Sequence, residues 1–307
     1  MGIWIDTDMG FDDIAAILTV AAAGFEIDGM SLVFGNAVLA QVERNAAGAA
    51  KAFCWSMPIH SGADRAVIGT TETASSILSE AGMPTAGLSL PEAGLPPTAP
   101  ALEALCGWLG DGAGEKRILA LGPLTNIAIL CLARPDLAKN ITEIVWMGGG
   151  VSLGNHTASA EFNALADPEA AAIVLSRAVP LTMADLDFCR KVRLRADDIR
   201  TLRLRAGRNA ALLADLTEGF LSIALKRGAS EMPFFDPAAA IAFCHPTLVS
   251  LQPVRIDIET AGTLTRGRTV VETRPHKAKF NARIISDVDA DTAHDLIMIA
   301  LASEAAR

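Results

Sequence analysis

The chain has 307 residues, is 51% hydrophobic and carries a formal net charge of −9. This length suits one large α/β domain or two smaller ones, and the acidic balance argues against a general nucleic-acid or anionic-membrane binder. No stretch reaches the roughly 18 uninterrupted apolar residues of a membrane helix, and acidic residues interrupt any apolar signal-peptide core. We therefore expect a cytoplasmic protein with no membrane or nucleic-acid partner.

The N-terminus combines an apolar start with a dense group of acids. Ile3-Trp4-Ile5 predicts a first strand, and four aspartates follow within the eight residues from Asp6 to Asp13. Gly10 predicts a sharp turn, and the apolar stretch 14–23 predicts a helix that starts at Asp12-Asp13. The carboxylates should then lie at the carboxyl end of a strand and the first turn of a helix, where open α/β sheets bind ligands.

Like charges this close repel one another, so the cluster predicts a bound cation. Oxygen ligands without cysteine or histidine favour a hard ion, Ca²⁺ or Mg²⁺. The alternative is a solvated acidic loop in which aspartates cap the helix, but capping explains only one or two of them.

Strand-like and helical segments alternate along the rest of the chain. Right-handed βαβ units follow from this order, and they predict an α/β fold with an open, mostly parallel central sheet flanked by helices. Residues 1–307 show no internal repeat or linker and form a single predicted domain. The expected strands are 27–34, 116–121, 141–147 and 179–184, with short strands in 254–285. The expected helices are 37–53, 101–109, 124–132, one opening at 167–169, and 290–302, and residues 56–100 form an irregular excursion.

A basic segment stands out in this acidic chain. Its interpretation is open between an anion or partner surface and a solvated helix face paired with nearby acids, and we favour the second. The five cysteines are odd in number and widely spaced, which is typical of reduced thiols. The basic segment consists of Arg190, Lys191, Arg193, Arg195, Arg200, Arg203, Arg205 and Arg208.

Several short motifs resemble those of one family when taken in order. The run Asp6–Asp13 resembles the DTDPGxDD signature of the nucleoside hydrolases, calcium-dependent N-ribohydrolases, with Met9 where proline is usual. Further matching stretches follow along most of the chain: Phe34-Gly35-Asn36, Leu121–Asn126, Met147–Gly150, Gly154-Asn155, Ala160–Asn163, Asp167–Ala170 and Asp236-Pro237. Together they predict a nucleoside hydrolase-like fold.

The resemblance also implies a set of roles. One Ca²⁺ per subunit would be held by the side chains of Asp8, Asp13 and Asp236 and by the carbonyl oxygen of Leu121. Asp8 would also be the general base that activates water for attack on the anomeric carbon. The implied substrate is a small-molecule ribonucleoside, and the implied assembly is a homodimer or homotetramer. The residues implied to contact the sugar are Asp12, Asn36, Met147, Asn155, Glu161, Phe162 and Asn163.

Elementary chemistry agrees with these roles. Ribosyl C–N cleavage passes through an oxocarbenium-like state, so it needs negative charge and a poised water nearby, which a metal can activate. Asparagine and glutamate suit a polyol because they offer donors and acceptors in fixed directions. For Glu161 and Asn163, the alternative role is hydrogen bonding within a loop at a helix start.

The departures from the family pattern concern the leaving base. Phe235 and Leu78 occupy the places where pyrimidine-accepting members commonly carry histidines. Phe235 could stack on a purine or pack in the core. His156 could supply an acid, although we favour a surface loop position for it, and His245 is expected to be structural. We therefore expect purine ribosides, or ribosides with a good leaving group, to be preferred substrates.

Two alternatives to a hydrolase remain at this stage. One is a calcium-dependent nucleoside-binding protein with little turnover, which the missing histidines suggest and the intact Asp8 opposes. The other is a haloacid-dehalogenase-type phosphatase, which also starts with a strand and Asp-x-Asp. That assignment leaves the Gly-Asn, Glu-Phe-Asn and Asp-Pro motifs without a role.

Overall fold

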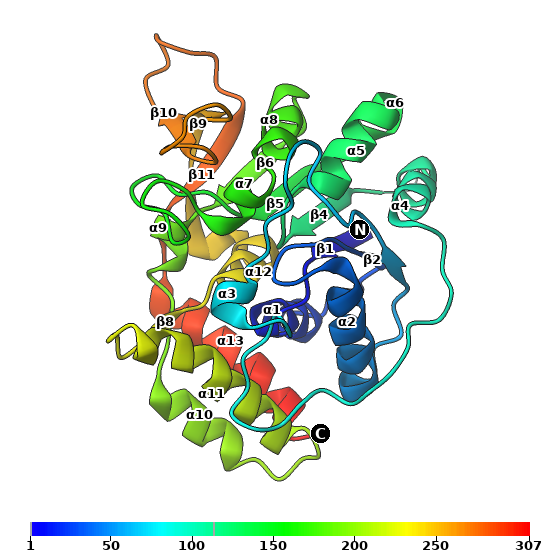
Figure 1. The fold of residues 1–307 in the computed structure, drawn as a ribbon, viewed down its shortest axis with the longest axis vertical. Coiled ribbons are helices and arrows are strands. Elements are labelled where there is room, and N and C mark those ends of the chain that lie inside the picture. The colour runs from blue at the N-terminus through cyan, green and yellow to red at the C-terminus, as the bar shows by residue number, and fades with distance from the viewer. Residues whose placement is uncertain (1, 113) are drawn as a thin grey trace.

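The protein is described by a computed structural model that covers residues 2–112 and 114–307. Its centre is a nine-stranded sheet with the order β10-β9-β11-β6-β5-β4-β1-β2-β3 (Figure 1). The seven strands from β11 to β3 pair in parallel, and β9 and β10 add antiparallel pairs at one edge. The strands are β1 Gly2–Thr7, β2 Gly29–Leu32, β3 Ile59–Ser61, β4 Lys116–Ala120, β5 Glu143–Met147, β6 Leu181–Ala184, β9 Val249–Ile258, β10 Thr269–Glu272 and β11 Ala282–Val288.

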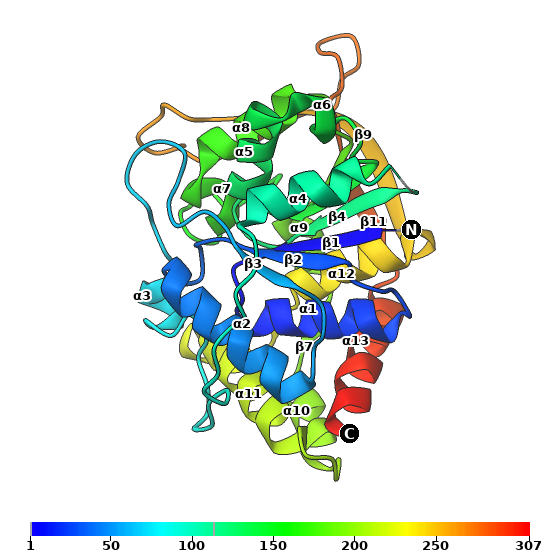
Figure 2. The same ribbon diagram turned by 90° about the vertical axis from the view of Figure 1, so that its right-hand side faces the viewer.

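Helices cover both faces of this sheet. Figure 2 shows α4, α5, α6 and α8 on one side and α1, α2, α12 and α13 on the other, with α10 and α11 beyond them. A separate pair of two-residue strands joins β7 Arg193–Leu194 to β8 Met232–Pro233. The helices are α1 Phe11–Ala22, α2 Leu39–Phe53, α3 Ser75–Leu78, α4 Ala101–Gly110, α5 Thr125–Ala133, α6 Pro135–Ala138, α7 Phe162–Ala166, α8 Pro168–Ser176, α9 Leu186–Cys189, α10 Ala196–Arg203, α11 Ala210–Lys226, α12 Asp236–Cys244 and α13 Ala290–Ala305.

The first strand shows how one short segment contributes to both cores. All six residues of β1 are buried. Ile3 and Ile5 pack into the cluster that contains α1, α12 and α13, whereas Trp4 packs into the cluster that contains α4, α5 and α8. Successive side chains of a strand point to opposite faces, so a continuous apolar run suits a parallel sheet covered on both sides. The predicted open, mostly parallel fold is confirmed.

Local details differ from the sequence-based expectations. The turn before α1 has its positive φ at Met9 (38°), whereas Gly10 is extended with φ −94°. Gly10 is needed for space, because an added Cβ would lie 2.6 Å from the Asn36 side-chain nitrogen. The excursion 56–100 was expected to be irregular throughout but contains β3 and α3, and β9 is ten residues long where short strands were expected.

Three further expectations can be compared with the structure. Among the described residues, no helix is both long enough and apolar enough to cross a membrane. All five cysteines are free thiols, of which Cys131, Cys189 and Cys244 are buried, Cys106 is half-buried and Cys54 is exposed. The helix expected to open at 167–169 is α8, and Asp167 caps it, because its side chain accepts a hydrogen bond from the amide of Ala170 at 3.0 Å.

Candidate active site

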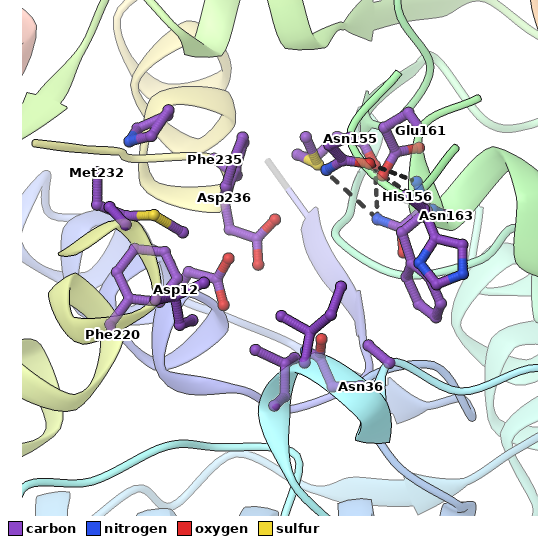
Figure 3. A pocket seen from close by; sticks show the side chains of 18 of the residues that line it. Asp12, Asn36, Asn155, His156, Glu161, Asn163, Phe220, Met232, Phe235 and Asp236 are labelled. Atoms are coloured by element: carbon purple, nitrogen blue, oxygen red, sulfur yellow. Dashed lines mark hydrogen bonds between the residues drawn. The ribbon is translucent and has the colours of Figure 1, made fainter. Parts of the chain in front are cut away.

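A cavity of about 410 Å³ lies at the carboxyl ends of the parallel strands. Of the twelve residues predicted for the site, eleven line this cavity, and Asp13 lies fully buried directly behind it. Figure 3 shows Asp12 and Asp236 on one side of the cavity and Asn155, Glu161 and Asn163 on the other. The sheet therefore brings together side chains that are more than 200 residues apart in sequence, at the edge where this fold class binds ligands.

Three carboxylates form the acidic centre of the cavity. Asp12, Asp13 and Asp236 each offer one oxygen within 4.8 Å of the others. Asp12 and Asp13 belong to the first turn of α1, and Asp236 is the first residue of α12. Two helix N-termini thus meet here, and their partial positive charges favour carboxylates. Asp13 is held rigidly, since it accepts hydrogen bonds from the Thr7 hydroxyl at 2.5 Å and the Gly10 amide at 2.7 Å.

Asp8 lies beside this centre and is oriented by Asn36. Its two oxygens accept bonds from the Asn36 backbone amide at 2.8 Å and from the Asn36 side-chain amide at 3.0 Å. The same side-chain nitrogen lies 3.2 Å from an oxygen of Asp13. A Cβ on Gly35 would overlap the Asp8 carboxylate, so only glycine allows the loop after β2 to approach this closely.

Asp6 is separated from the other acids of its motif. Its carboxylate accepts hydrogen bonds from the Ser31 hydroxyl and from the Asn126 side-chain amide, the latter at 2.8 Å, and it does not line the cavity. It connects β1 with β2 and α5 inside the fold. The sequence cluster of four aspartates therefore divides into a structural residue and three site residues, which Asp236 joins from far along the chain.

Burial and mutual repulsion favour the neutral form of these acids. Burial, followed by the charge of Asp13, raises the pKa of Asp12 to about 8. The pKa values of Asp8 and Asp236 are also raised well above their ordinary range, chiefly by burial and then by the neighbouring aspartates. No basic side chain among the described residues forms an ion pair with any of the four site aspartates. Buried carboxylates without a basic partner fit a hard divalent cation.

The predicted backbone ligand also faces the site. The carbonyl oxygen of Leu121 accepts a hydrogen bond from the Asn163 side-chain amide at 2.7 Å, and the same nitrogen donates to the Met147 carbonyl at 3.0 Å. A carbonyl oxygen has two lone pairs, so this bond leaves one for a cation or a hydroxyl. Asn163 therefore ties the ends of β4 and β5 together under the cavity.

Glu161 has the structural role that was considered as the alternative, and it also lines the cavity. Its carboxylate caps α7 by accepting bonds from the amides of Asn163 at 2.8 Å and Ala164 at 3.0 Å, and a third from Gly149 at 2.8 Å. Burial raises its pKa to about 7 although these bonds oppose the shift. Asn155 accepts a bond from the Phe162 amide at 3.0 Å, so both polar side chains hold the loop against α7.

The residues expected near the leaving base include one correction. His156 was expected in a surface loop, but it lines the cavity with its side chain only 20% exposed and its ring 5.2 Å from that of Phe162. In Figure 3 it lies on the side of Asn155 and Glu161, opposite Phe235. Phe235 and Leu78 line the cavity as well, whereas His245 follows α12 and does not.

The sequence analysis missed a second group of lining residues. They come from the end of α9, from α11 and its C-terminal end, and from the β7–β8 pair. The sequence analysis considered Arg190 and Arg193 only as members of the basic segment, and no short motif marks the others as functional. The helical spacing of α11 indicates only that one face is buried, without indicating which part of that face borders a cavity. These residues are Phe220, Ile223, Ala224, Arg227, Met232, Pro233, Arg190 and Arg193.

Comparisons with known proteins agree with this geometry. The model of the family "Inosine-uridine preferring nucleoside hydrolase" matches residues 3–295. A pyrimidine-specific ribonucleoside hydrolase RihA of Citrobacter koseri is 32% identical, with 97% of this chain and 96% of the relative covered. A non-specific ribonucleoside hydrolase RihC of Klebsiella pneumoniae is 34% identical, with 94% of this chain and 93% of the relative covered.

Solved structures show the same fold. A purine-preferring ribonucleoside hydrolase from Gardnerella vaginalis superposes with a TM-score of 0.91 at 24% identity, covering all of this chain (100%) and 99% of that one. A plant nucleoside hydrolase, PpNRh1, also gives a TM-score of 0.91, at 21% identity, with 98% and 99% covered. The relatives named by their specificity thus include pyrimidine-specific, non-specific and purine-preferring hydrolases.

Proposed function

The chain belongs to the inosine-uridine preferring nucleoside hydrolase family and is an enzyme with N-ribohydrolase activity, and we propose that it acts through one calcium ion and Asp8 as general base. The observation that carries this proposal is the group of buried site carboxylates, which have no basic partners among the described residues. The family assignment removes the phosphatase alternative and the alternative of a binding protein without activity. Asp8, Asp13, Asp236 and the Leu121 carbonyl are the proposed calcium ligands.

Calcium, when bound, supplies charge that lowers the pKa of water and accepts sugar hydroxyls into a flexible shell. Asp8 takes the proton of the attacking water, and the bonds from Asn36 keep its carboxylate aimed at that position. Asp12 and Asn36 orient the vicinal hydroxyls, and Asn155, Glu161 and Asn163 bind the remaining ones. The carboxylates also stabilise the positive charge that develops on the sugar ring as the C–N bond breaks.

We propose that purine ribosides, or ribosides with an intrinsically good leaving group, are preferred over uridine and cytidine. The support is the apolar pair Phe235 and Leu78 at the leaving-group side, which cannot protonate a departing pyrimidine. A purine can take a proton at N7 from water, and Phe235 can stack on its ring. Because the relatives differ in base specificity, this preference rests on the two side chains alone.

A substrate panel tests both parts of the proposal. The purified enzyme is assayed with p-nitrophenyl riboside, inosine and uridine, first with calcium and then after chelation and dialysis. Hydrolysis of p-nitrophenyl riboside needs no leaving-group acid, so it reports on the sugar site alone. We expect chelation to abolish all three activities and calcium to restore them, with inosine well above uridine. Full activity after chelation would refute the calcium proposal, and equal rates for uridine and inosine would refute the purine preference.

The sugar contacts make a separate prediction about deoxyribosides. A site built to hydrogen-bond a hydroxyl leaves buried polar groups unpaired when that hydroxyl is absent, which can cost about 10⁴-fold in discrimination. We expect inosine to exceed 2′-deoxyinosine by a large factor in kcat/KM. Similar values for the two substrates would contradict the roles of Asp12 and Asn36.

The remaining proposals concern assembly and location. We propose a cytoplasmic homodimer or homotetramer, and the five free thiols are consistent with a reducing compartment. Light scattering coupled to size-exclusion chromatography measures the assembly directly, and a monomeric mass would refute it.

A further inference from the structure

Most residues of the arginine-rich segment form ion pairs or hydrogen bonds, and two of its members, Arg190 and Arg193, line the cavity. Arg195 pairs with Glu231 at 3.0 Å and Lys191 with Asp287 at 3.4 Å, and Arg200 and Arg203 pair with Asp197 and Glu218. The favoured interpretation, a solvated face paired with acids, is therefore correct for most of the segment. Arg193 is different: its side chain lines the cavity and has no hydrogen bond or ion pair with any residue that the structure describes.

The backbone puts Arg193 next to the strand that leads into Phe235. Arg193 lies opposite Pro233 in the antiparallel pair β7–β8, and the Phe234 amide donates to the Val192 carbonyl at 2.9 Å. Leu78 of α3 lines the same cavity as Pro233 and Phe235. Arg193 therefore belongs to the side of the cavity where the leaving base is expected.

A second guanidinium lies at the same end. Arg227 follows the last turn of α11, lines the cavity and likewise makes no ion pair with a described residue. The cavity wall near the two arginines is otherwise mainly apolar, apart from the Glu231 carboxylate, which is paired with Arg195 at 3.0 Å. Unpaired cations above apolar walls suit a flat ligand with a negative substituent, because a guanidinium binds a carboxylate through two parallel hydrogen bonds. The apolar wall residues are Phe220, Ile223, Ala224, Met232, Pro233 and Phe235.

The opposite end of the cavity is unsuited to an anion. Glu161 lines it with a carboxylate, and the nearest arginine is already engaged. Arg190 donates to the carbonyls of Gly154 at 2.9 Å and Leu153 at 3.4 Å, and it lies 3.8 Å from the Asp187 carboxylate. A phosphate on the sugar would meet these acids. A negative group on the base would meet Arg193 and Arg227, which pair with no acid among the described residues, whereas the Glu231 carboxylate at this end is already paired with Arg195.

We propose that Arg193, assisted by Arg227, forms a subsite for aromatic leaving groups that carry a carboxylate. This inference rests on the proposed riboside hydrolysis. In the reaction, water adds to the anomeric carbon, Asp8 takes its proton, and the C–N bonding pair stays with the ring nitrogen of the leaving group. The arginines hold the carboxylate of that ring throughout, so they act on specificity and not on the bond-breaking step.

Nicotinate riboside and nicotinamide riboside form a matched pair of probes. In both, the pyridine nitrogen of the leaving group departs without needing a proton. The two differ only in the ring substituent, which is a carboxylate in nicotinate riboside and a carboxamide in nicotinamide riboside. The readout is the ratio of their kcat/KM values, compared between wild type and R193Q, so the intrinsic reactivity of the two substrates cancels. Loss of a charge-assisted hydrogen bond to the carboxylate should change this ratio by about tenfold or more. We expect R193Q to lower the ratio by about this factor and R193K to lower it less.

The control is R205Q in the same segment. Arg205 is exposed and lies outside the cavity, so its replacement should leave the ratio as in wild type. An unchanged ratio in R193Q, with the variant folded by circular dichroism, would overturn the proposal.

A second arm compares inosine with inosine 5′-monophosphate. If wild type prefers the monophosphate and R193Q loses this preference, Arg193 binds a sugar phosphate. That result would overturn the proposal as well. If wild type fails on p-nitrophenyl riboside, the proposed function fails, which is a separate result.

Discussion

At the scale of single residues, the site depends on carboxylates that are buried before any ligand arrives. Asp13 and Asp8 each accept several hydrogen bonds from neighbouring groups, which offset part of the cost of burying their charge. The remaining cost appears as raised pKa values. Such residues can bind a cation and accept a proton, and their individual roles are separable by substitution.

Asp8→Asn tests the general base. The amide keeps the size of the side chain and one oxygen ligand, but it cannot accept the proton of water. General bases contribute about 10²–10⁴-fold to rate, so we expect kcat for p-nitrophenyl riboside to fall by at least this range. Calcium content, measured by elemental analysis, should stay near that of wild type. A variant with bound calcium and wild-type kcat would show that another group accepts the proton.

At the scale of elements, the close approach of the loop after β2 to the end of β1 positions Asp8. The loop brings Asn36 to the carboxylate, and Gly35 leaves space for it. The arrangement depends on parallel pairing between β1 and β2, in which Thr7 lies beside Leu32. A small change in this loop should therefore affect Asp8, the proposed general base, directly.

Gly35→Ala tests this close approach. The new Cβ would overlap the Asp8 carboxylate, so the loop or Asp8 must shift. We expect kcat to fall at least tenfold and calcium to bind more weakly. Gly107→Ala is the matched control, because nothing lies within 4 Å of an added Cβ in α4 and alanine favours a helix by about 1 kcal/mol. Equal activity in the two variants would mean that the loop tolerates the shift.

A histidine couples two elements away from the cavity. His294 on α13 contacts Asp198 on α10 at 3.1 Å, and this bond chiefly raises its pKa. Because the folded state holds the proton more tightly, the stabilisation is complete below the unfolded pKa of about 6.5 and is lost as pH rises through the folded pKa. His294→Gln should lower Tm at pH 5.5 more than at pH 9. The exposed His276→Gln should show no such difference. A loss of Tm for His294→Gln that is the same at both pH values would exclude this coupling.

At the scale of the whole molecule, the acidic centre joins distant parts of one sheet-based fold. Asp12 and Asp13 start α1, Asp236 starts α12, and these two helices pack against each other beneath the sheet (Figure 2). A cation bound between their first turns would hold the two helices together. Calcium binding should therefore stabilise the entire fold and not only the cavity.

The stabilisation by calcium should increase with pH. The pKa values of the site aspartates are raised in the folded state, so the metal-free fold holds their protons more tightly than the unfolded chain does. Its stability therefore falls as pH rises from about 4, the ordinary pKa of aspartate, through the pKa of Asp12 at about 8. Protons compete with calcium at low pH. At free calcium about 100 times Kd, the expected gain is about 2.7 kcal/mol. Thermal melts with calcium and with chelator should differ more at pH 8 than at pH 5.5. A difference that is constant or falls with pH would contradict the carboxylate site.

The sequence by itself determined the class of fold and most of the residues that line the candidate site. Apolar runs separated by helical periods predict a parallel sheet, because that pattern depends only on local spacing. The motifs near Asp8, Asn36, Leu121, Glu161 and Asp236 each follow a predicted strand or precede a helix, so their meeting at one edge of the sheet could be inferred.

Only the tertiary structure decided which groups contact each of these side chains. It directs Asp6 into the core, brings His156 into the cavity wall and places Arg193 in that wall with no side-chain partner among the described residues. None of these follows from local periodicity, because each depends on contacts between segments far apart in sequence. Strand order and helix packing set these contacts, and a linear pattern of residue types contains no information about which partners remain free.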